Sequence, residues 1–509
     1  MKSRAEAICV RLARTLISSI VPLAAYCVSA LAQDVRIEHV TVVSPERSSP
    51  LTDVTVVIRG ARIASISSNA RARTAGSSGT AVQIINGRGL YLAPGLIDSH
   101  VHSGGVPGMT VADERAHPDL ARVAREQIPR SYLYFGFTTL VDLDARPAQT
   151  MQWNGYAAHP DVYFCGATPV VDGYPMNWEP KPERYEAWPY MLVQSGEERA
   201  LPAGIDVAAH TPEAVVSRMK ADGMFCVKSF FEPGQDGARN LPVPRLDTMR
   251  SLVRAAHLAG MPVFLHAIGS KAQEFAVAAG VDIIAHGMPQ WDAQPENVTQ
   301  LTPHVQQILD RVIEARMGWQ PTLQVIYGFR DMHDPEYLSD PTLARVLPAG
   351  LIKWYRTAEG QSFRERLAQG LPKGAAAAWN TVRANSAAPI ARNQSAARYL
   401  AGRNARILFG TDTPAALIYT NPPGLNGWLE MRRLVAGGLT AHQVFVAATL
   451  TNATALGLAG EIGTVEEGKR ANLILLRQDP TLTVQAYDEI VKVVIRGKVI
   501  ERAELAARR

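Results

Sequence analysis

The chain has 509 residues, of which 47% are hydrophobic and 19% are charged. This balance excludes a disordered chain, a collagen and a coiled coil, and the length suits a large barrel with an added domain. The formal net charge of +5 falls to +2 once residues 1–32, with four basic side chains and one acidic side chain, are set aside. We therefore expect no nucleic-acid partner.

Residues 1–32 have the pattern of a cleaved signal peptide. Basic residues precede an apolar run, and Ala30 and Ala32 stand at the two positions that a signal peptidase reads. The run is shorter than the roughly 20 residues that span a bilayer, and it contains Pro22, which argues against a stable membrane anchor. We expect a mature protein that begins near Gln33 and is periplasmic or secreted.

Two of the four cysteines, Cys9 and Cys27, belong to this first segment. The mature chain keeps Cys165 and Cys226, which allow one disulfide at most. The protein is therefore not a small fold held together by disulfides.

Both ends of the mature chain are rich in β-branched residues that are interrupted by glycine turns. Short strands are predicted over residues 35–43, 54–59, 62–66, 81–85, 472–476 and 491–499. Residues 57–63 and 494–500 also resemble each other, since each is predicted as a strand, a glycine turn and a second strand. We therefore expect residues 33–92 and 460–509 to meet in one small β-sandwich.

Residues 93–459 alternate apolar runs of strand length with helical patterns. The eight predicted strands cover residues 96–102, 138–143, 162–166, 225–231, 262–266, 281–286, 317–320 and 407–412. This alternation indicates an α/β fold, a (β/α)8 TIM barrel. Two connections, 144–211 and 323–405, are long enough to build a lid or a pocket. Trp178 and Trp188 in the first connection are the aromatic residues that we expect to line a substrate pocket.

A barrel displays its active site at the C-terminal ends of its strands. The polar residues at those positions are His100, His102, Lys228, His266, His286 and Asp412. His100 and His102 share one face of a strand, so both can reach one metal ion. Lys228 lies inside an apolar strand, where an ammonium without a partner is unfavourable. A single strand-end histidine is more often structural, but the whole set at one mouth indicates a metal site.

Three stretches of the sequence resemble the amidohydrolase superfamily, and within it the imidazolonepropionase-like and Xaa-Pro dipeptidase-like branch. Residues 93–102 are similar to its first-strand signature, and residues 410–412 to its eighth-strand signature. Residues 463–473 are similar to the turn that returns the chain to the family's β-sandwich. The resemblance covers nearly the whole mature chain.

The resemblance implies two divalent metal ions, for which Zn²⁺ suits the nitrogen and oxygen donors best. The ligands that it implies are His100, His102 and Asp412 for one ion, His266 and His286 for the other, and a CO₂-derived carbamate on Lys228 as the bridge. A metal-activated hydroxide would attack a carbonyl carbon. Asp412 would be the catalytic residue that accepts the proton and delivers it to the leaving nitrogen.

The activity implied is that of an exported binuclear metal-dependent amidohydrolase that cleaves an amide or peptide-type C–N bond. Its partner would be a small-molecule amide or a dipeptide-like substrate. Relatives often assemble, which leaves a homo-oligomer open. Two alternatives also stay open: the same metal site could hydrolyse a lactone or a phosphotriester, or the scaffold could be a metal-binding pseudoenzyme or binding module.

The sequence departs from the family pattern at three positions. Gly269 stands where superfamily deaminases place a glutamate, three residues after the fifth-strand histidine, which counts against deamination. Phe230 replaces a tyrosine that is frequent in related dipeptidases, so their contacts to the substrate carbonyl or carboxylate do not carry over. Ala285 precedes His286 where a glutamate is more usual, so the ligand is kept in different surroundings.

Overall fold

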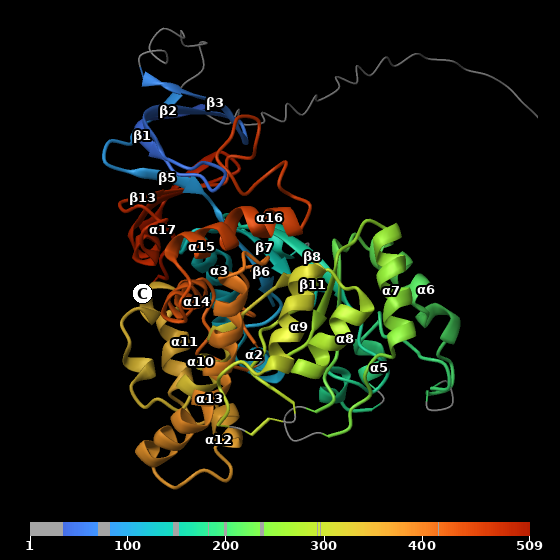
Figure 1. Ribbon diagram of the computed structural model, residues 1–509. Coiled ribbons are helices and arrows are strands. Elements are labelled where there is room, and N and C mark those ends of the chain that lie inside the picture. The colour runs from blue at the N-terminus through green and yellow to red at the C-terminus, as the bar shows by residue number, and fades with distance from the viewer. Residues whose placement is uncertain are drawn as a thin grey trace, which may run out of the picture.

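The computed structural model describes residues 34–69, 82–145, 152–181, 183–197, 201–234, 239–292, 294–295, 297–415 and 417–508. The predicted signal peptide lies outside these residues. The described chain forms a mixed sheet from its two ends and a parallel sheet from its middle, with helices packed around the parallel sheet (Figure 1).

The mixed sheet joins both ends of the chain, in the order β15-β14-β13-β5-β1-β2-β3, with β4 paired to β1. Its strands are β1 (Asp34–Val42), β2 (Leu51–Arg59), β3 (Arg62–Ser68), β4 (Val82–Asn86), β5 (Tyr91–Pro94), β13 (Leu473–Leu476), β14 (Ile490–Ile495) and β15 (Lys498–Glu501). The strands form one sheet rather than the two stacked sheets expected of a sandwich. The physical reason is β1, which pairs with β2, β4 and β5, and whose register shifts between Ile37 and Val42 allow it to bend.

The two segments that resemble each other form the hairpins β2–β3 and β14–β15. The turns of these hairpins meet, because a Cβ atom added to Gly497 would lie 1.8 Å from the carbonyl oxygen of Gly60. The contact therefore requires glycine at position 497. It shows that the sheet curls until its two distant hairpins touch.

The parallel sheet has seven strands in the order β12-β11-β10-β9-β8-β7-β6. They are β6 (Leu96–Val101), β7 (Phe137–Asp142), β8 (Asp161–Ala167), β9 (Cys226–Phe230), β10 (Val263–His266), β11 (Ile283–Ala285) and β12 (Gly318–Trp319). These are the first seven of the eight predicted strands.

The eighth predicted strand, 407–412, is not a strand of this sheet. Its segment instead forms isolated parallel bridges, one from Ile407 to Trp319 in β12 and one from Thr413 to Val101 in β6. The ladder is interrupted because Asp412 has a φ of 58°, which turns the backbone out of the extended conformation. The segment nevertheless lies between the two outer strands of the parallel sheet.

Helices follow most of the parallel strands, as the alternation in the sequence predicts. Their bounds are α2 (Val111–Ala116), α3 (Pro118–Tyr134), α5 (Glu183–Ala187), α6 (Pro212–Ala221), α7 (Leu246–Leu258), α8 (Ser270–Ala279), α9 (Pro303–Glu314), α10 (Leu323–Asp331), α11 (Ala349–Tyr355), α12 (Ser362–Leu367), α13 (Ala375–Ala401), α14 (Leu425–Ala436), α15 (Ala441–Val446), α16 (Asn452–Ala455) and α17 (Arg502–Leu505). The long connection 323–405 is mainly helical, as predicted. None of the described helices combines the length and the apolar character that a bilayer span requires.

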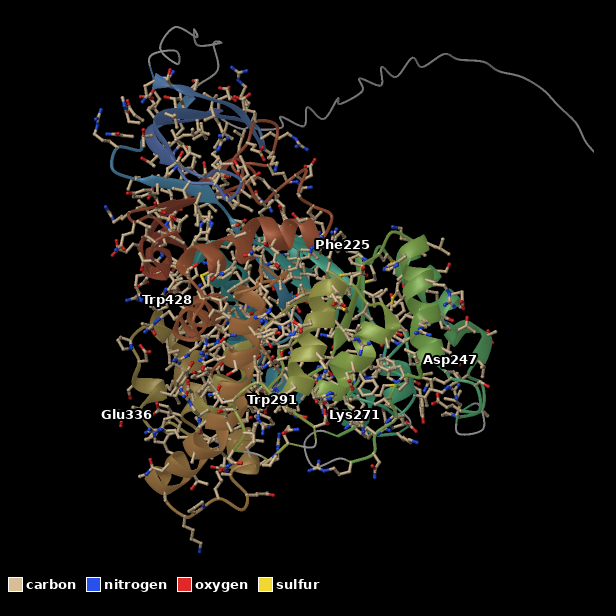
Figure 2. The ribbon with its side chains drawn as sticks, viewed as in Figure 1. Phe225, Asp247, Lys271, Trp291, Glu336 and Trp428 are labelled. Atoms are coloured by element: carbon tan, nitrogen blue, oxygen red, sulfur yellow. A yellow bond between two sulfur atoms is a disulfide. The ribbon has the colours of Figure 1, made fainter. Side chains whose placement is uncertain are left out.

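The parallel strands begin near the mixed sheet and end on the opposite side of the molecule. In Figure 2, Phe225 before β9 lies close to α16, whereas Lys271 after β10 lies at the far end. A buried apolar layer crosses several of the strands near their starts, and it includes Ile97, Phe264 and Ile283. The C-terminal strand ends therefore face away from the mixed sheet, above this apolar layer.

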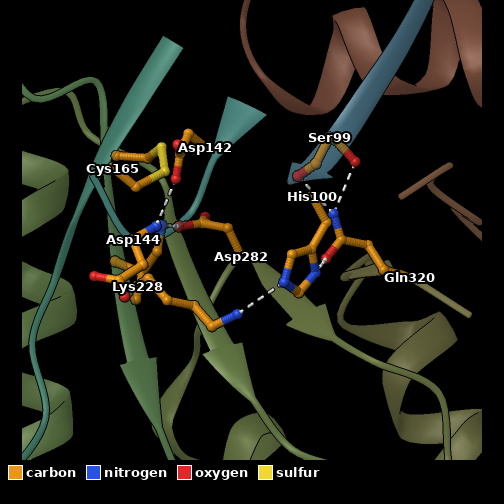
Figure 3. Close-up of a disulfide and its surroundings, with 10 residues drawn as sticks. Ser99, His100, Asp142, Asp144, Cys165, Lys228, Asp282 and Gln320 are labelled. Carbon is orange, nitrogen blue, oxygen red and sulfur yellow. Dashed lines mark hydrogen bonds between the residues drawn. A yellow bond between two sulfur atoms is a disulfide. The ribbon is translucent and has the colours of Figure 1, made fainter. Parts of the chain in front are cut away.

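A disulfide joins two neighbouring strands within the same apolar layer. Cys165 of β8 and Cys226 of β9 are register partners, both are fully buried, and their Cα atoms lie 4.4 Å apart. Lys228 follows Cys226 by two residues, so the two side chains share one face of β9. Figure 3 shows the disulfide and Lys228 on this pair of strands. The sequence allowed such a bridge without predicting that it forms.

Replacing Cys165 and Cys226 together by alanine should lower the free energy of unfolding by about 2–5 kcal/mol. The bridge closes a loop with a sequence separation of 61 residues, which restricts the unfolded chain. Urea denaturation of the oxidised wild type and of the double variant measures the difference. Equal stabilities of the two proteins would show that the bridge does not support the fold.

Candidate metal centre

His100 and His102 stand at the C-terminal end of β6, on the same face of the strand. The Nδ1 atom of the fully buried His100 lies 3.1 Å from Oε1 of Gln320. The amide nitrogen of Gln320 donates to the carbonyl oxygen and to the hydroxyl of Ser99, at 2.9 and 2.7 Å, so its oxygen is the acceptor for His100 (Figure 3). This arrangement leaves Nε2 of His100 as the ligand nitrogen.

Asp412 faces both first-strand histidines. Its Oδ1 atom lies 2.8 Å from Nε2 of His102 and 3.2 Å from Nε2 of His100, and its Oδ2 atom lies 3.8 Å from Nδ1 of His286. Burial alone would raise the pKa of this carboxyl, but contact with the surrounding histidines, of which His102 donates a hydrogen bond, holds its pKa well below the usual range. Asp412 is therefore an ionised carboxylate that can bind a cation or accept a proton.

Lys228 reaches the same place from the middle of β9. The side chain is 2% exposed, and its Nζ atom lies 3.4 Å from Nε2 of His100 and 5.7 Å from the ring centre of Phe230. Burial lowers the pKa of Lys228 to about 8, although Asp412 and Asp144 oppose the shift. A larger fraction of this amine is therefore neutral at pH 7 than in an exposed lysine.

His266 and His286 end β10 and follow β11. Their ring centres are 4.5 Å apart, and the ring of His286 lies 4.8 Å from that of His100. Burial lowers the pKa of both residues, so both rings are neutral near pH 7 and can bind a metal ion through a lone pair. The Nδ1 atom of His286 contacts the hydroxyl of Thr322 at 3.1 Å.

Two of these residues have a left-handed backbone conformation. His286 has a φ of 74° and Asp412 a φ of 58°. Aspartate and histidine tolerate this region better than most residues, but it remains uncommon outside glycine. Such conformations cluster at functional sites, because the surrounding structure holds the side chain in a position that a regular strand would not give it.

The donor atoms fit a divalent metal. One ligand atom from each of His100, His286 and Asp412 lies within 4.8 Å of the others, and His102 adjoins them through Asp412. Imidazole nitrogens and a carboxylate are typical zinc ligands. The structure thus brings together all six residues that the sequence singles out, and Lys228 and His266 complete the cluster through His100 and His286.

Three carboxylates that support the cluster were not predicted. Glu232, two residues after β9, is 3% exposed and lies 3.3 Å from His266. Asp98 accepts hydrogen bonds from the amide and the hydroxyl of Thr411, and burial raises the pKa of Asp98 to about 7. Asp142 accepts a hydrogen bond from the backbone N–H of Ser103 at 2.8 Å. The available signal was the presence of a carboxylate inside or just after an apolar strand, which is costly without partners.

The first long connection contributes aromatic rings beside the cluster. The ring of Tyr174 lies 4.9 Å from that of His266 and 5.0 Å from that of Trp178. Trp178 is 48% exposed, whereas Trp188 is 7% exposed and belongs to a separate apolar core of this connection. The structure therefore distinguishes the two tryptophans that the sequence treats alike. Trp178 lies at the rim of the site, and Trp188 packs inside the connection.

The model of the amidohydrolase family matches residues 355–500. A curated relative, the 5-methylthioadenosine/S-adenosylhomocysteine deaminase of Moorella thermoacetica, is 41% identical over 86 residues. The match covers 13% of this chain and 20% of the relative, so the chain matches about one fifth of that enzyme's length.

Solved structures match over much more of the chain. A Xaa-Pro dipeptidase with methionine bound in its active site aligns with a TM-score of 0.63 and 20% identity, over 92% of this chain and 100% of its own. The ochratoxinase of A. niger aligns with a TM-score of 0.63 and 18% identity, over 92% and 96% of the two chains. A putative prolidase from Bifidobacterium longum aligns with a TM-score of 0.61 and 20% identity, over 92% of this chain and 95% of its own. At these identities the likeness establishes a shared fold.

Proposed function

We propose that the chain is an amidohydrolase, an exported hydrolase that uses two divalent metal ions to cleave an amide or peptide-type C–N bond, since the family model matches residues 355–500. The proposal takes the parallel sheet as a barrel that the segment 407–413 closes. The observation that carries the proposal is the convergence of four histidines, Asp412 and the buried Lys228 at one end of the sheet.

The ligands divide into two sets. The first ion would be held by His100, His102 and Asp412, and the second by His266 and His286. When bound, such ions act as Lewis acids and lower the pKa of a coordinated water from 15.7 to about 7. Zn²⁺ suits these donors best, and manganese and cobalt are the substitutes that also bind nitrogen and oxygen donors.

Lys228 would join the two ions as a carbamate. Its neutral amine attacks the carbon of CO₂. An N–C bond forms as one C–O π bond opens to a carboxylate, and the nitrogen releases one proton to solvent, so the neutral amine becomes an anion. The lowered pKa of Lys228 supports this step, because an ammonium has no lone pair with which to attack. The anion would then be balanced by the metal ions beside it.

Asp412 would move the proton. Its carboxylate is ionised, and the Oδ1 atom lies between His100 and His102. The carboxylate can therefore accept a proton from the attacking water and return it to the leaving nitrogen. A protein that only bound metal or ligand would have no need of this second role. The site therefore favours an enzyme over a binding module, while a lactone or phosphotriester substrate remains the alternative reaction.

Gly269 favours cleavage of an amide or peptide-type bond over deamination. This residue lies at the start of α8, three positions after His266, where superfamily deaminases carry a glutamate. The solved relatives named as a dipeptidase and a prolidase support a substrate with an amide-type bond. Export is supported by the buried disulfide of Cys165 and Cys226, because such bonds persist mainly in oxidising compartments.

Wild-type protein loaded with Zn²⁺ should contain about two ions per chain, and Lys228→Ala should contain fewer and lose activity. The variant removes the proposed bridge, and an added short carboxylic acid should restore part of the rate. Elemental analysis after gel filtration gives the ratio. Lys220→Ala, which removes an exposed lysine on α6, is the matched control. A Lys228→Ala protein with both ions and full rate would exclude the bridge.

Asp412→Asn should retain measurable metal but lose about 10²–10⁴-fold in kcat, because an amide oxygen can bind a metal ion but cannot accept the proton. Rates are compared at equal metal occupancy, with the exposed Asp247→Asn on α7 as control. The acidic limb of kcat/KM should also change, since the wild-type carboxylate accepts a proton only when it is ionised. A fully loaded Asn variant within a few-fold of the wild-type rate would reduce Asp412 to a metal ligand.

The two tryptophans should respond differently to alanine. Trp178→Ala should change the order of preferred amide substrates and leave the free energy of unfolding within about 0.5 kcal/mol of wild type, because the ring is half exposed at the rim. Trp188→Ala should lose about 3–5 kcal/mol, because it empties a buried position. Steady-state rates on an amide panel and urea denaturation measure the two effects. Unchanged preferences in Trp178→Ala would remove this residue from the substrate pocket.

A further inference from the structure

Glu232 is a buried carboxylate with no part in the reaction outlined above. It lies two residues beyond the end of β9 and is 3% exposed. Its Oε2 atom is 3.3 Å from Nε2 of His266, and its Oε1 atom accepts the backbone N–H of Gly234 at 3.1 Å. Each oxygen is thus engaged by one group of the protein.

The contact determines which nitrogen of His266 is available. A neutral imidazole has one donor nitrogen and one acceptor nitrogen. The carboxylate of Glu232 accepts a hydrogen bond from Nε2–H of His266, so Nδ1 keeps the lone pair that a metal ion needs. His100 is held the other way round, since its Nδ1–H donates to the amide oxygen of Gln320. The Nδ1 atom of His286 contacts the hydroxyl of Thr322, which can donate or accept a hydrogen bond.

Glu232 also differs in charge from Gln320 and Thr322, the groups that contact His100 and His286. His100 faces an amide and His286 faces a hydroxyl, whereas His266 faces a carboxylate. The proposed first site has Asp412 as its own anionic ligand. In the proposed second site, Glu232 is the carboxylate beside His266, at 3.3 Å, whereas Asp412 comes within 3.8 Å of His286.

We propose that Glu232 is a positioning residue for the second metal site: it orients His266 so that Nδ1 binds the ion, and it makes the ring a stronger donor. Carboxylates that accept from a ligand histidine act in this way, and their loss typically weakens metal binding about 10–100-fold. The inference rests on the proposed function, because it presupposes a metal ion at His266 and His286.

The test compares Zn²⁺ binding by wild type, Glu232→Ala and Glu232→Gln in competition with a chelator. We expect wild type to retain two ions, and Glu232→Ala to keep one tightly and to bind the second about 10–100-fold more weakly. Glu232→Gln should lie between them, because its amide oxygen still accepts from Nε2–H but carries no charge. Asp161→Asn is the matched control. Asp161 is a largely buried carboxylate that forms a salt bridge with Arg496. It lies at the start of β8, the end of the strand away from the proposed metal site, so its loss should lower stability without releasing metal.

Activity in excess Zn²⁺ separates positioning from direct catalysis. If Glu232 acts through His266, then filling the second site of Glu232→Ala should restore the rate to within a few-fold of wild type. Unchanged affinity for both ions, or a rate that stays low with both sites filled, would overturn the proposal while leaving the proposed function intact. Wild type that fails to bind two ions would overturn both.

Discussion

The burial of Lys228 is the constraint around which the site is organised. The side chain is almost completely buried, and no salt bridge of the described residues includes it. Its Nζ atom contacts the ring of His100, which is neutral because burial lowers the pKa of His100 to about 3. Such surroundings favour an uncharged amine or its conversion to an anion next to metal ions. The surrounding histidines and carboxylates supply what that conversion requires.

The site also depends on segments that are far apart in the sequence. Asp412 donates its backbone N–H to the carbonyl oxygen of His100 at 2.7 Å, and Thr411 is held by Asp98. The first-strand histidines and the carboxylate that they face are thus fixed to one another through the backbone as well as through their side chains. The mixed sheet brings the two ends of the chain together behind this junction. Damage to either end should therefore disturb the site even where no ligand is removed.

Much of this arrangement could be predicted from the sequence, because strand ends of a parallel sheet converge. The period of the strands placed His100, His102, Lys228 and His266 correctly. The eighth strand could not be predicted as it stands, since the left-handed conformation of Asp412 is set by tertiary contacts.

The supporting residues Gln320 and Glu232 were also missed. They act by contacting histidines from other strands, and no local pattern marks such a contact. The same holds for the contrast between Trp178 and Trp188. Exposure depends on how the long connection folds over the strand ends, and composition alone gives both tryptophans the same expectation.

The central claim is that two metal ions share this cluster through Lys228. Anomalous X-ray diffraction at the zinc edge, from crystals grown with Zn²⁺ and bicarbonate, tests it most directly. The account predicts two anomalous peaks, one beside His100, His102 and Asp412 and one beside His266 and His286, with density for a carbamate on Lys228 between them. A single peak, with Lys228 an unmodified amine, would contradict it.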